Sequence, residues 1–282
     1  CAKAGMTVFA GCLTQAGIDS LKAESSAGNL LPVQVDVTKD ESVQKAREFV
    51  DKNLPKGVHF WGVVANAGVF TIYGPDDWCT MKEYEFSVDV NCYGVIRVIK
   101  TFMDLIKQSE GRVVAVSSVA GRTSVPCGAP YAVAKYGVEA YMDAIRMETY
   151  LFGVKVSILE PGVFKTNLID IEAHNKRVDS VWNKLSKKVQ DAWGLEFRDY
   201  FKTKWNTTMN MMGSSRIEYV VDNYFHALTA RFPRHRYPCG YDAIFYWLPM
   251  TYVDSRIADA FTRLVAGNKV LPTALKRKLK AA

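Results

Sequence analysis

The sequence predicts an α/β fold, a doubly wound, Rossmann-like parallel sheet flanked by helices. Short apolar runs rich in β-formers alternate with longer helical patterns up to about residue 160, which is typical of parallel sheets. Several runs, such as "VVAVS", are apolar on consecutive residues, as expected for strands that are covered on both faces. The 282 residues, 49% of them hydrophobic, are enough for one large domain spanning 1–282.

Five strands and four helices are predicted in this first part of the chain. The strand candidates lie at 6–13, 30–38, 60–69, 111–121 and 153–162. The helix candidates lie at about 15–27, 40–53, 80–108 and 131–151, and Gly153 is a suitable stop for the last of them. Ligands gather at the carboxyl ends of parallel strands, so a site is expected near "ANAG", "SSVAG" and "EPG", each of which ends a strand.

The pattern changes after Gly162. Residues 163–215 are rich in Lys, Asn, Asp and Met and carry three tryptophans, and no strong strand is predicted there. This segment is either a surface helical insert or a lid that covers a substrate. The remaining region, 237–282, forms an apolar and basic tail, in which the run 241–253 is too short to span a bilayer. Buried core is favoured for that run, with a membrane-interface patch as the alternative.

Charge is concentrated at the end of the chain. The net charge is +7, but residues 263–282 carry six basic residues and no acidic one, which leaves the rest near neutral. A nucleic-acid binder is expected to have a basic patch within its fold, so no nucleic-acid partner is predicted. The tail is either solvated or attracted to an anionic membrane surface.

Cysteine and histidine usage argues against disulfides and metals. The six cysteines include no CxxC pair, which predicts reduced thiols in a reducing compartment. The four histidines have no ligand spacing, so no metal site is expected. The first residue is Cys1 rather than Met, and a strand-like run begins at Met6 without a signal-peptide pattern. We therefore expect that the sequence lacks its true N-terminus.

The segment "YAVAKYGVEAYMDAI" contains a candidate acid–base pair. Residues i and i+4 of a helix share one face, so Tyr131 and Lys135 project together, whereas Tyr136 and Tyr141 do not share this relation and are expected to pack. An ammonium beside a phenol favours the phenolate, and a shift of two pKa units needs roughly 2.7 kcal/mol. Tyr131 is therefore expected to have a lowered pKa and to exchange a proton with a carbonyl or alcohol oxygen.

Two further polar residues fit this chemistry. Ser118 ends a predicted strand, where its hydroxyl could stabilise charge on the same substrate oxygen, while Ser117 alternates to the opposite face. Asn91 lies within an apolar helical pattern, where an unpartnered amide would be costly. Each of these signals is weak in isolation.

Together these residues resemble the tetrad of the short-chain dehydrogenase/reductase family, whose chain order of Asn, Ser, Tyr and Lys is met by Asn91, Ser118, Tyr131 and Lys135. "DVT" at 36–38, "NAG" at 66–68 and "PG" at 161–162 also match family segments that contact the adenine, the adenosine and the nicotinamide. The cofactor-binding residues that the resemblance implies are Asp36, Val37, Asn66, Ala67, Gly68, Tyr131, Lys135, Pro161, Gly162 and Thr166.

The resemblance also implies a role for each member of the tetrad. Tyr131 would be the proton donor and acceptor, and Lys135 would lower its pKa and hold the nicotinamide ribose. Ser118 would orient the substrate oxygen, and Asn91 would anchor a water that links Lys135 to a proton relay. The hydride chemistry would belong to the cofactor.

The family's glycine-rich phosphate loop, TGxxxGxG, is absent. "GCLTQAG" at 11–17 fits better as the end of the second strand of the family, beside the adenosine ribose. We expect the first strand and its loop to be missing from the sequence, the alternative being a cofactor-free relic. Residues 10–18 contain no Arg or Lys to meet a 2′-phosphate, which favours NAD over NADP without excluding NADP.

Segments such as "YGVEAYMDAIR" and "FGVKVSILEPGVFKT" resemble the branch that holds retinol and hydroxysteroid dehydrogenases. This resemblance implies a small apolar alcohol or ketone as the substrate, and 3-hydroxybutyrate is the alternative substrate. The alternative from a different class is a catalytically inactive protein that binds a lipid or a partner. Members of this branch are typically held on the endoplasmic reticulum, and "KLKAA" resembles a dilysine signal. A mitochondrial location is the alternative. Members of the family often form dimers, so a homodimer is expected.

Overall fold

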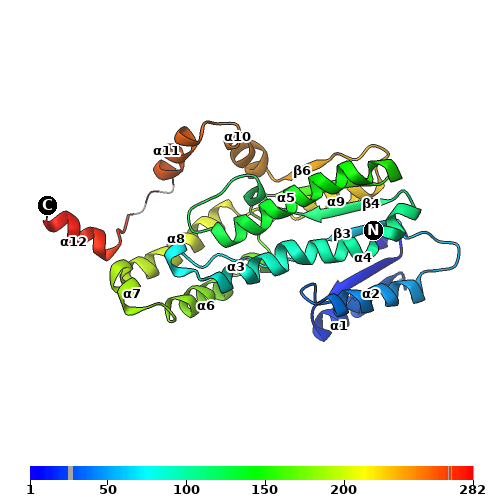
Figure 1. Cartoon of the computed structure of the whole chain (residues 1–282), viewed down its shortest axis with the longest axis horizontal. Coiled ribbons are helices and arrows are strands. Elements are labelled where there is room, and N and C mark those ends of the chain that lie inside the picture. Colours follow the sequence, from blue (N-terminus) through cyan, green and yellow to red (C-terminus); the bar gives the residue numbers. More distant parts are fainter. Residues whose placement is uncertain (25–27, 266, 268, 282) are drawn as a thin grey trace.

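The structure, a computed structural model, describes residues 1–24, 28–265, 267 and 269–281. Strands β1 (Val8–Cys12) and β2 (Leu30–Gln34) pair in parallel as one sheet. Strands β3 (Gly62–Ala65), β4 (Arg112–Val116), β5 (Lys155–Pro161) and β6 (Arg236–Cys239) form a second parallel sheet in that order. The α/β fold with a parallel, helix-flanked sheet is confirmed, although within the described residues the strands form two sheets rather than one (Figure 1).

Helices follow the strands in the order expected for parallel crossovers. The first five are α1 (Gln15–Glu24), α2 (Asp40–Asn53), α3 (Met81–Val88), α4 (Gly94–Gln108) and α5 (Ala129–Thr149). The segment after β5 holds α6 (Ile171–Trp182), α7 (Lys187–Trp193), α8 (Leu195–Met212) and α9 (Glu218–Thr229). After β6 come α10 (Leu248–Met250), α11 (Ser255–Val265) and α12 (Thr273–Ala281).

The observed boundaries differ from the predicted ones at functional loops. The strands are shorter at their carboxyl ends because "NAG" and "SSVAG" leave the sheet to form loops and a 3-10 turn at Val119–Gly121. The single helix predicted at 80–108 is two helices joined by a π-helical turn, Asp89–Tyr93. Of the helix predicted at 15–27, residues 25–27 lie outside the described part. Strand β6 was missed because it has only four residues and contains Pro238, which cannot donate to a ladder.

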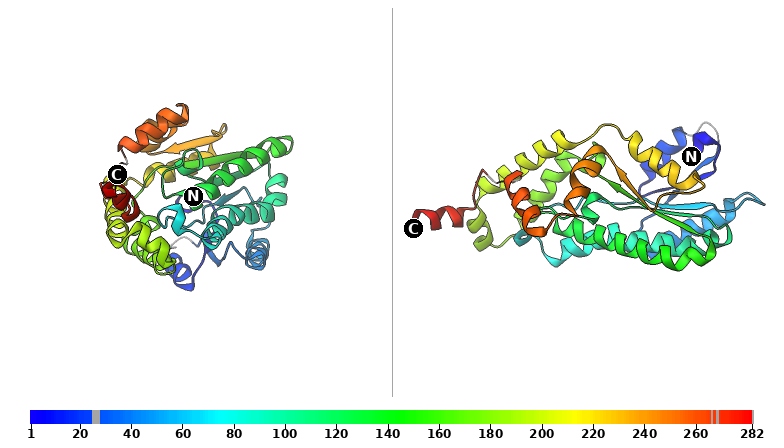
Figure 2. Two further views of the ribbon diagram at one scale, coloured as in Figure 1. Left: turned by 60° about the vertical axis from the view of Figure 1, so that its left-hand side comes forward. Right: turned by 90° about the horizontal axis from the view of Figure 1, so that it is seen from above.

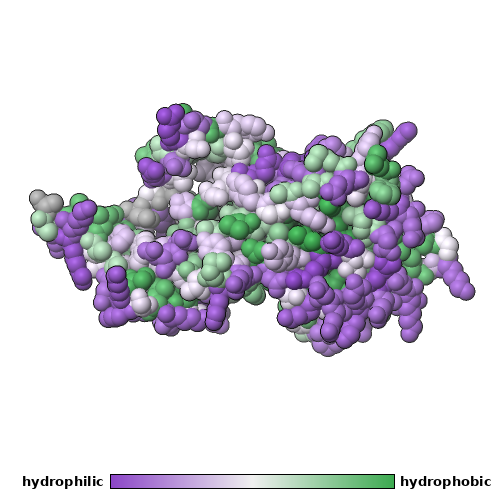
Figure 3. Space-filling view, viewed as in Figure 1, coloured by the Kyte–Doolittle hydropathy of each residue, from purple (hydrophilic) through white to green (hydrophobic). Residues whose placement is uncertain are grey.

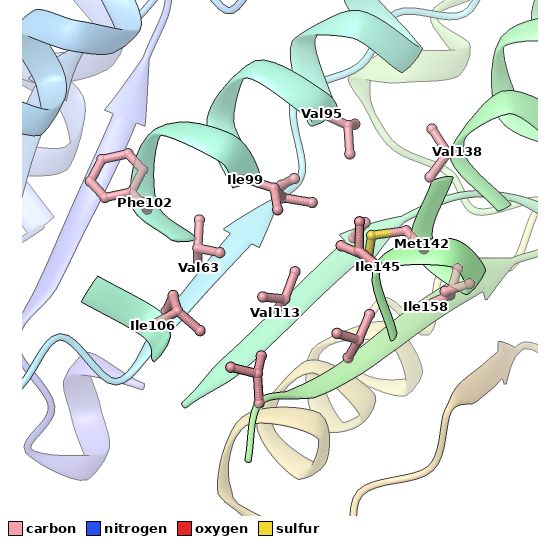
Figure 4. Close-up of a cluster of buried hydrophobic side chains, with 14 of the residues drawn as sticks. Val63, Val95, Ile99, Phe102, Ile106, Val113, Val138, Met142, Ile145 and Ile158 are labelled. Atoms are coloured by element: carbon pink, nitrogen blue, oxygen red, sulfur yellow. The ribbon is translucent and has the colours of Figure 1, made fainter. Parts of the chain in front are cut away.

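The main core lies between the β3–β5 strands and the helices α4 and α5 (Figure 4). Val113, Val114 and Ala115 of β4 are consecutive and all fully buried, because helices cover both faces of this sheet. A separate cluster on the other face joins β4, β5 and β6 to α9 through Leu159, Ala227 and Tyr237, among others. The rigid centre of the sheet therefore fixes the carboxyl ends of β4 and β5, where Ser118 and Pro161 lie.

The C-terminal region departs from the favoured expectation. Most large apolar side chains of 241–253 face solvent, with Phe245 74% and Tyr252 83% exposed, so the buried-core interpretation of this run is wrong. Only the short Ala243 is fully buried there among the described residues of the run. Helix α12 lies at one end of the molecule, where Lys276 bonds to Glu196 of α8, and α11 lies along its side (Figure 2). In the part of the chain that the structure describes, no helix is long and apolar enough to cross a membrane.

Candidate functional site

Tyr131 and Lys135 lie one turn apart on α5, as the spacing predicts. The helix begins at Ala129, and Pro130 in its first turn fits there because the first helical N–H groups need no helical partner. Both side chains are buried, with Tyr131 6% and Lys135 4% exposed. The Lys135 ammonium nitrogen lies 5.7 Å from the centroid of the Tyr131 ring. The two groups therefore share one dry site.

The burial of this pair shifts both pKa values in opposite directions. Burial raises the pKa of Tyr131 to about 12, against a smaller lowering by a hydrogen bond with Ser118. Burial lowers the pKa of Lys135 to about 8, while Glu139 and Cys92 act to raise it. The expectation that Tyr131 has a lowered pKa is therefore wrong for this structure, because the loss of hydration outweighs the hydrogen bond with Ser118.

Ser118 joins the ends of two strands beside Tyr131. Its hydroxyl accepts a hydrogen bond from the Ala120 amide at 3.1 Å, which caps the turn that follows β4. The same hydroxyl donates to the Pro161 carbonyl at 3.4 Å, at the end of β5. The adjacent Val163 amide donates to the Asp242 carboxylate at 2.8 Å. These contacts hold the "EPG" loop against the catalytic candidates.

Asn91 anchors the "NAG" loop from the π-helical turn. It is fully buried, and its amide forms two hydrogen bonds with Val69, accepting from the backbone N–H at 2.8 Å and donating to the carbonyl at 3.0 Å. A Cβ on Gly68 would lie 3.0 Å from Asn91 Oδ1 and 3.7 Å from Lys135 Nζ. Gly68, Asn91 and Lys135 are therefore in close contact, and the loop backbone can approach only because residue 68 has no side chain.

The remaining predicted cofactor residues lie on separate loops. The Asp36 carboxylate accepts hydrogen bonds from the Thr38 amide and hydroxyl at 2.9 and 2.7 Å, and these bonds hold its pKa below the ordinary value. Val37 packs against α4, since a Cβ on Gly94 would lie 2.7 Å from its methyl carbon. Ala67 is exposed, and Asn66 accepts a hydrogen bond from the Tyr224 hydroxyl at 2.5 Å.

Thr166 and Gly162 complete the predicted set. Thr166 is exposed and caps the 3-10 turn Asn167–Ile169. A Cβ on Gly162 would lie 2.1 Å from the Asp242 carboxylate, so the loop after β5 has no room for a side chain at this position.

The residues present fit the nicotinamide half of a dinucleotide. Lys135 Nζ donates to the Val116 carbonyl at 2.9 Å, and an ammonium carries three N–H groups, so it retains donors for ribose hydroxyls. Gly68 keeps a side chain out of the space beside Lys135, and Gly162 does the same in the loop after β5, next to Asp242. The glycine-rich phosphate loop has no counterpart in the sequence, so this fit concerns the nicotinamide and adenosine ends only.

Aromatic residues cover Tyr131, and the sequence reasoning did not assign them a role. Phe70 meets the Tyr131 ring edge to face at 5.0 Å, and the Trp205 ring of α8 lies 5.5 Å from Phe70. Tyr131 belongs to an apolar cluster with Trp182 and Phe197, among others, from the 163–215 segment. The three tryptophans spaced through that segment were the feature of the sequence that could have indicated this role. Their contact with Tyr131 depends on tertiary packing.

Glu139 and Arg236 were also missed. Glu139 is one turn beyond Lys135 on α5 and is buried, and Arg236 of β6 forms an ion pair with it. The spacing of Glu139 from Lys135 could have been read from the sequence, but its partner 97 positions away could not. Among the described residues, no group of three or more His, Cys, Asp or Glu side chains is placed to hold a metal ion.

The chain is similar to named dehydrogenases. A family model described as short chain dehydrogenase matches residues 1–177. A 3beta-hydroxysteroid dehydrogenase dhs-16 of Caenorhabditis elegans is 41% identical over 98% of this chain and 74% of its own length. A retinol dehydrogenase 7 of Rattus norvegicus is 39% identical over 91% of this chain and 80% of its own.

Further relatives agree with these. A 17-beta-hydroxysteroid dehydrogenase type 6 of Bos taurus is 37% identical over 90% of this chain and 79% of its own length. Among solved structures, a short-chain dehydrogenase from Streptomyces avermitilis has a TM-score of 0.67 at 20% identity, covering 95% of this chain and 91% of its own. This last likeness concerns the fold alone.

Proposed function

Because the chain belongs to the short-chain dehydrogenase family and is an oxidoreductase of its retinol and hydroxysteroid dehydrogenase branch, we propose that Tyr131, Lys135, Ser118 and Asn91 form its active site. The observation that carries this proposal is the buried Tyr131 and Lys135 pair, which lies beside Ser118 on one side and the Asn91-anchored loop on the other. The reaction interconverts an alcohol and a carbonyl of a retinoid or steroid-like substrate.

The position of each of these four residues supports a role in the reaction. Tyr131 donates a proton to the carbonyl oxygen in reduction and accepts one from the alcohol in oxidation, and the Ser118 hydroxyl hydrogen-bonds the same oxygen. The positive charge of Lys135 favours the phenolate form of Tyr131 once substrate fills the site. Through its two hydrogen bonds to Val69, Asn91 holds the loop that places Gly68 close to Lys135. The nicotinamide, when bound, supplies the hydride acceptor or donor.

The enzyme uses a nicotinamide cofactor, and we infer that NAD is preferred. The segment from Ala10 to Ile18 after β1 carries no basic side chain that could pair with a 2′-phosphate. Asp36, Val37, Asn66, Ala67, Gly68, Pro161, Gly162 and Thr166 would hold this cofactor.

The 163–215 segment is proposed as the lid over an apolar substrate. Its helices α6, α7 and α8 supply the aromatic rings that surround Tyr131, including Trp205. An apolar wall of this kind suits a retinoid or steroid skeleton and offers little to a small charged acid.

Two surfaces support proposals about assembly. Phe245 and Tyr252, both exposed, with the apolar side chains of α11 and the basic α12, favour association with a membrane surface. Lys278 and Lys280 at the end of α12 suit a dilysine signal and hence the endoplasmic reticulum. The face that carries α4 and α5 shows hydrophobic patches (Figure 3). Tyr93 and Tyr136 are also exposed, and these observations favour a homodimer.

The test is Tyr131→Phe in the full-length protein, assayed with retinol, hydroxysteroids and 3-hydroxybutyrate, each with NAD and with NADP. The variant keeps the ring that packs on Phe70 but removes the exchangeable proton, so turnover should fall by roughly 10²-fold or more. Tyr136→Phe is the matched control, since Tyr136 is half-exposed on another face, and it should retain its activity. Turnover by Tyr131→Phe at the wild-type rate would refute the site. A folded wild type without turnover on any substrate would favour the non-catalytic alternative.

A further inference from the structure

A cluster of buried charges lies directly behind the catalytic turn of α5. Glu139 is buried, and Glu160 of β5 is 1% exposed, yet both are carboxylates. Arg236 of β6 contacts both of them, with Nη1 2.9 Å from Glu160 Oε1 and in direct contact with Glu139 Oε2. The second guanidinium nitrogen, Nη2, lies 2.5 Å from Asp143 Oδ2 on the next turn of α5. One guanidinium thus connects three acidic side chains.

Cations lie against both buried carboxylates. Burial raises the pKa of Glu139, and Arg236 acts against that rise. Glu160 has a second cation, since Arg122 Nη1 lies 2.9 Å from Glu160 Oε1. An unpaired buried carboxylate would instead take up a proton. The ion pair with Arg236 therefore favours the ionised form of Glu139, against the effect of its burial.

Glu139 is packed against the backbone of Lys135. It is four residues further along α5, so the two side chains share a face. The Ser117 hydroxyl donates to the Lys135 carbonyl at 3.3 Å. A Cβ on Gly121 would lie 2.5 Å from Ser117 Oγ, 2.9 Å from Glu139 Cγ and 3.0 Å from the Lys135 carbonyl oxygen, so these three groups surround one point.

We propose that Glu139, held by Arg236, is a positioning residue that sets the pH at which the Tyr131 and Lys135 pair loses its first proton. This inference rests on the proposed function of that pair. Glu139 does not reach the reacting atoms, and it acts through the charge of Lys135. The ion pair with Arg236 makes this effect depend on β6, a strand that contributes no residue to the tetrad.

Glu139 is the source of negative charge among the described groups around Lys135. From its own helix Lys135 faces Tyr131 and Glu139, and from the π-helical turn it faces Asn91 and Cys92. Burial raises the pKa of Cys92, so this thiol is neutral at physiological pH. From β4 it faces the Val116 carbonyl. Among the described residues, Glu139 is therefore the carboxylate whose charge acts on Lys135.

The sign of the effect does not depend on which group titrates first. The fully protonated pair carries one positive charge and the singly deprotonated pair carries none, whether the proton leaves Lys135 or Tyr131. Removing a negative charge beside the pair disfavours the positive state, so the first apparent pKa must fall. For two charges roughly 6–8 Å apart at an effective dielectric constant near 20, the expected fall is about 1.5–2 pH units.

The test compares Glu139→Gln with Asp143→Asn in the full chain. Protein carrying ¹³C- and ¹⁵N-labelled lysine and tyrosine is titrated by NMR without cofactor, and the signals are assigned by their loss in Lys135→Met and Tyr131→Phe. Glu139→Gln should lower the first midpoint of the pair by about 1.5–2 units. Asp143→Asn removes a charge from the same helix and the same arginine, but further from Lys135 and partly in water, so its midpoint should move by less than about 0.3 unit.

A second readout is the pH dependence of kcat/KM for oxidation, whose rising limb should shift to lower pH in Glu139→Gln and be restored in Glu139→Asp. If Glu139→Gln does not fold, the charge-balanced double variant Glu139→Gln, Arg236→Met replaces it and should give a smaller shift of the same sign. An unchanged midpoint in the folded variant, or equal shifts in Glu139→Gln and Asp143→Asn, would overturn the inference. The titration is independent of turnover, so an inactive wild type would refute the proposed function without deciding this one.

Discussion

Replacing Asn91 with alanine is expected to reduce the free energy of unfolding by about 2–4 kcal/mol, because an unsatisfied buried polar group costs about 1–3 kcal/mol. The amide of Asn91 is fully buried and makes two bonds, of 2.8 and 3.0 Å, to the N–H and carbonyl of Val69. The substitution leaves both backbone groups without these partners and empties the space of the amide. Val69 is half-buried, so water can reach part of the gap, which keeps the loss below the sum of two full penalties.

The same substitution should lower catalytic efficiency. Asn91 holds the loop that brings Gly68 to within contact of Lys135, and a loop that moves by an ångström misplaces groups on which the rate depends. A decrease in kcat/KM of at least 10-fold is expected, together with the lower stability.

Urea unfolding followed by circular dichroism measures the stability, and Asn183→Ala is the matched control. Asn183 is exposed at the end of α6, so its replacement should change the free energy of unfolding by less than about 0.5 kcal/mol. If Asn91→Ala were as stable as this control, the two bonds to Val69 would not be holding the loop, and the argument for Asn91 would fail.

Three other predictions test separate parts of the description. Burial lowers the pKa of Lys135 to about 8, so the unfolded chain binds more protons than the folded chain above that pH. The free energy of unfolding of wild type relative to Lys135→Met should therefore rise between about pH 8 and 10, and urea unfolding at each pH measures this rise. Gly162→Ala places a carbon 2.1 Å from the Asp242 carboxylate and should cost about 2 kcal/mol or more, whereas an unaffected melting curve would contradict the contact. Replacing exposed Phe245 and Tyr252 with serine should reduce co-flotation with anionic phospholipid vesicles several-fold, and equal flotation would count against the membrane surface.

Helical spacing and strand ends could be predicted from the sequence because both are local. Tyr131 and Lys135 are separated by one turn, and the run "VVAVSS" places Ser118 at a strand end. The family resemblance then brought in Asn91, but its position in a π-helical turn and its bonds to Val69 are tertiary features. The short strand β6 carried too weak a pattern to detect.

The pKa of Tyr131 could not be predicted because it depends on which rings cover it. The sequence places a cation one turn away, which alone would lower the value. The structure adds Phe70 and, behind it, Trp205, from segments 61 and 74 positions away from Tyr131, and burial raises the pKa of Tyr131. In the same way, the charge on Glu139 depends on Arg236, which reaches it only because β6 pairs with β5.

These charges alternate in sign from the edge of the sheet to the substrate side of α5. Arg236 is positive, Glu139 is negative and Lys135 is positive, and the group that must become negative in oxidation, Tyr131, comes next. Burial disfavours every one of these ions taken alone, so each is stable only with its neighbour charged. Arg236 and Glu139 therefore favour the phenolate indirectly, by keeping Lys135 protonated in a site where burial alone would neutralise it.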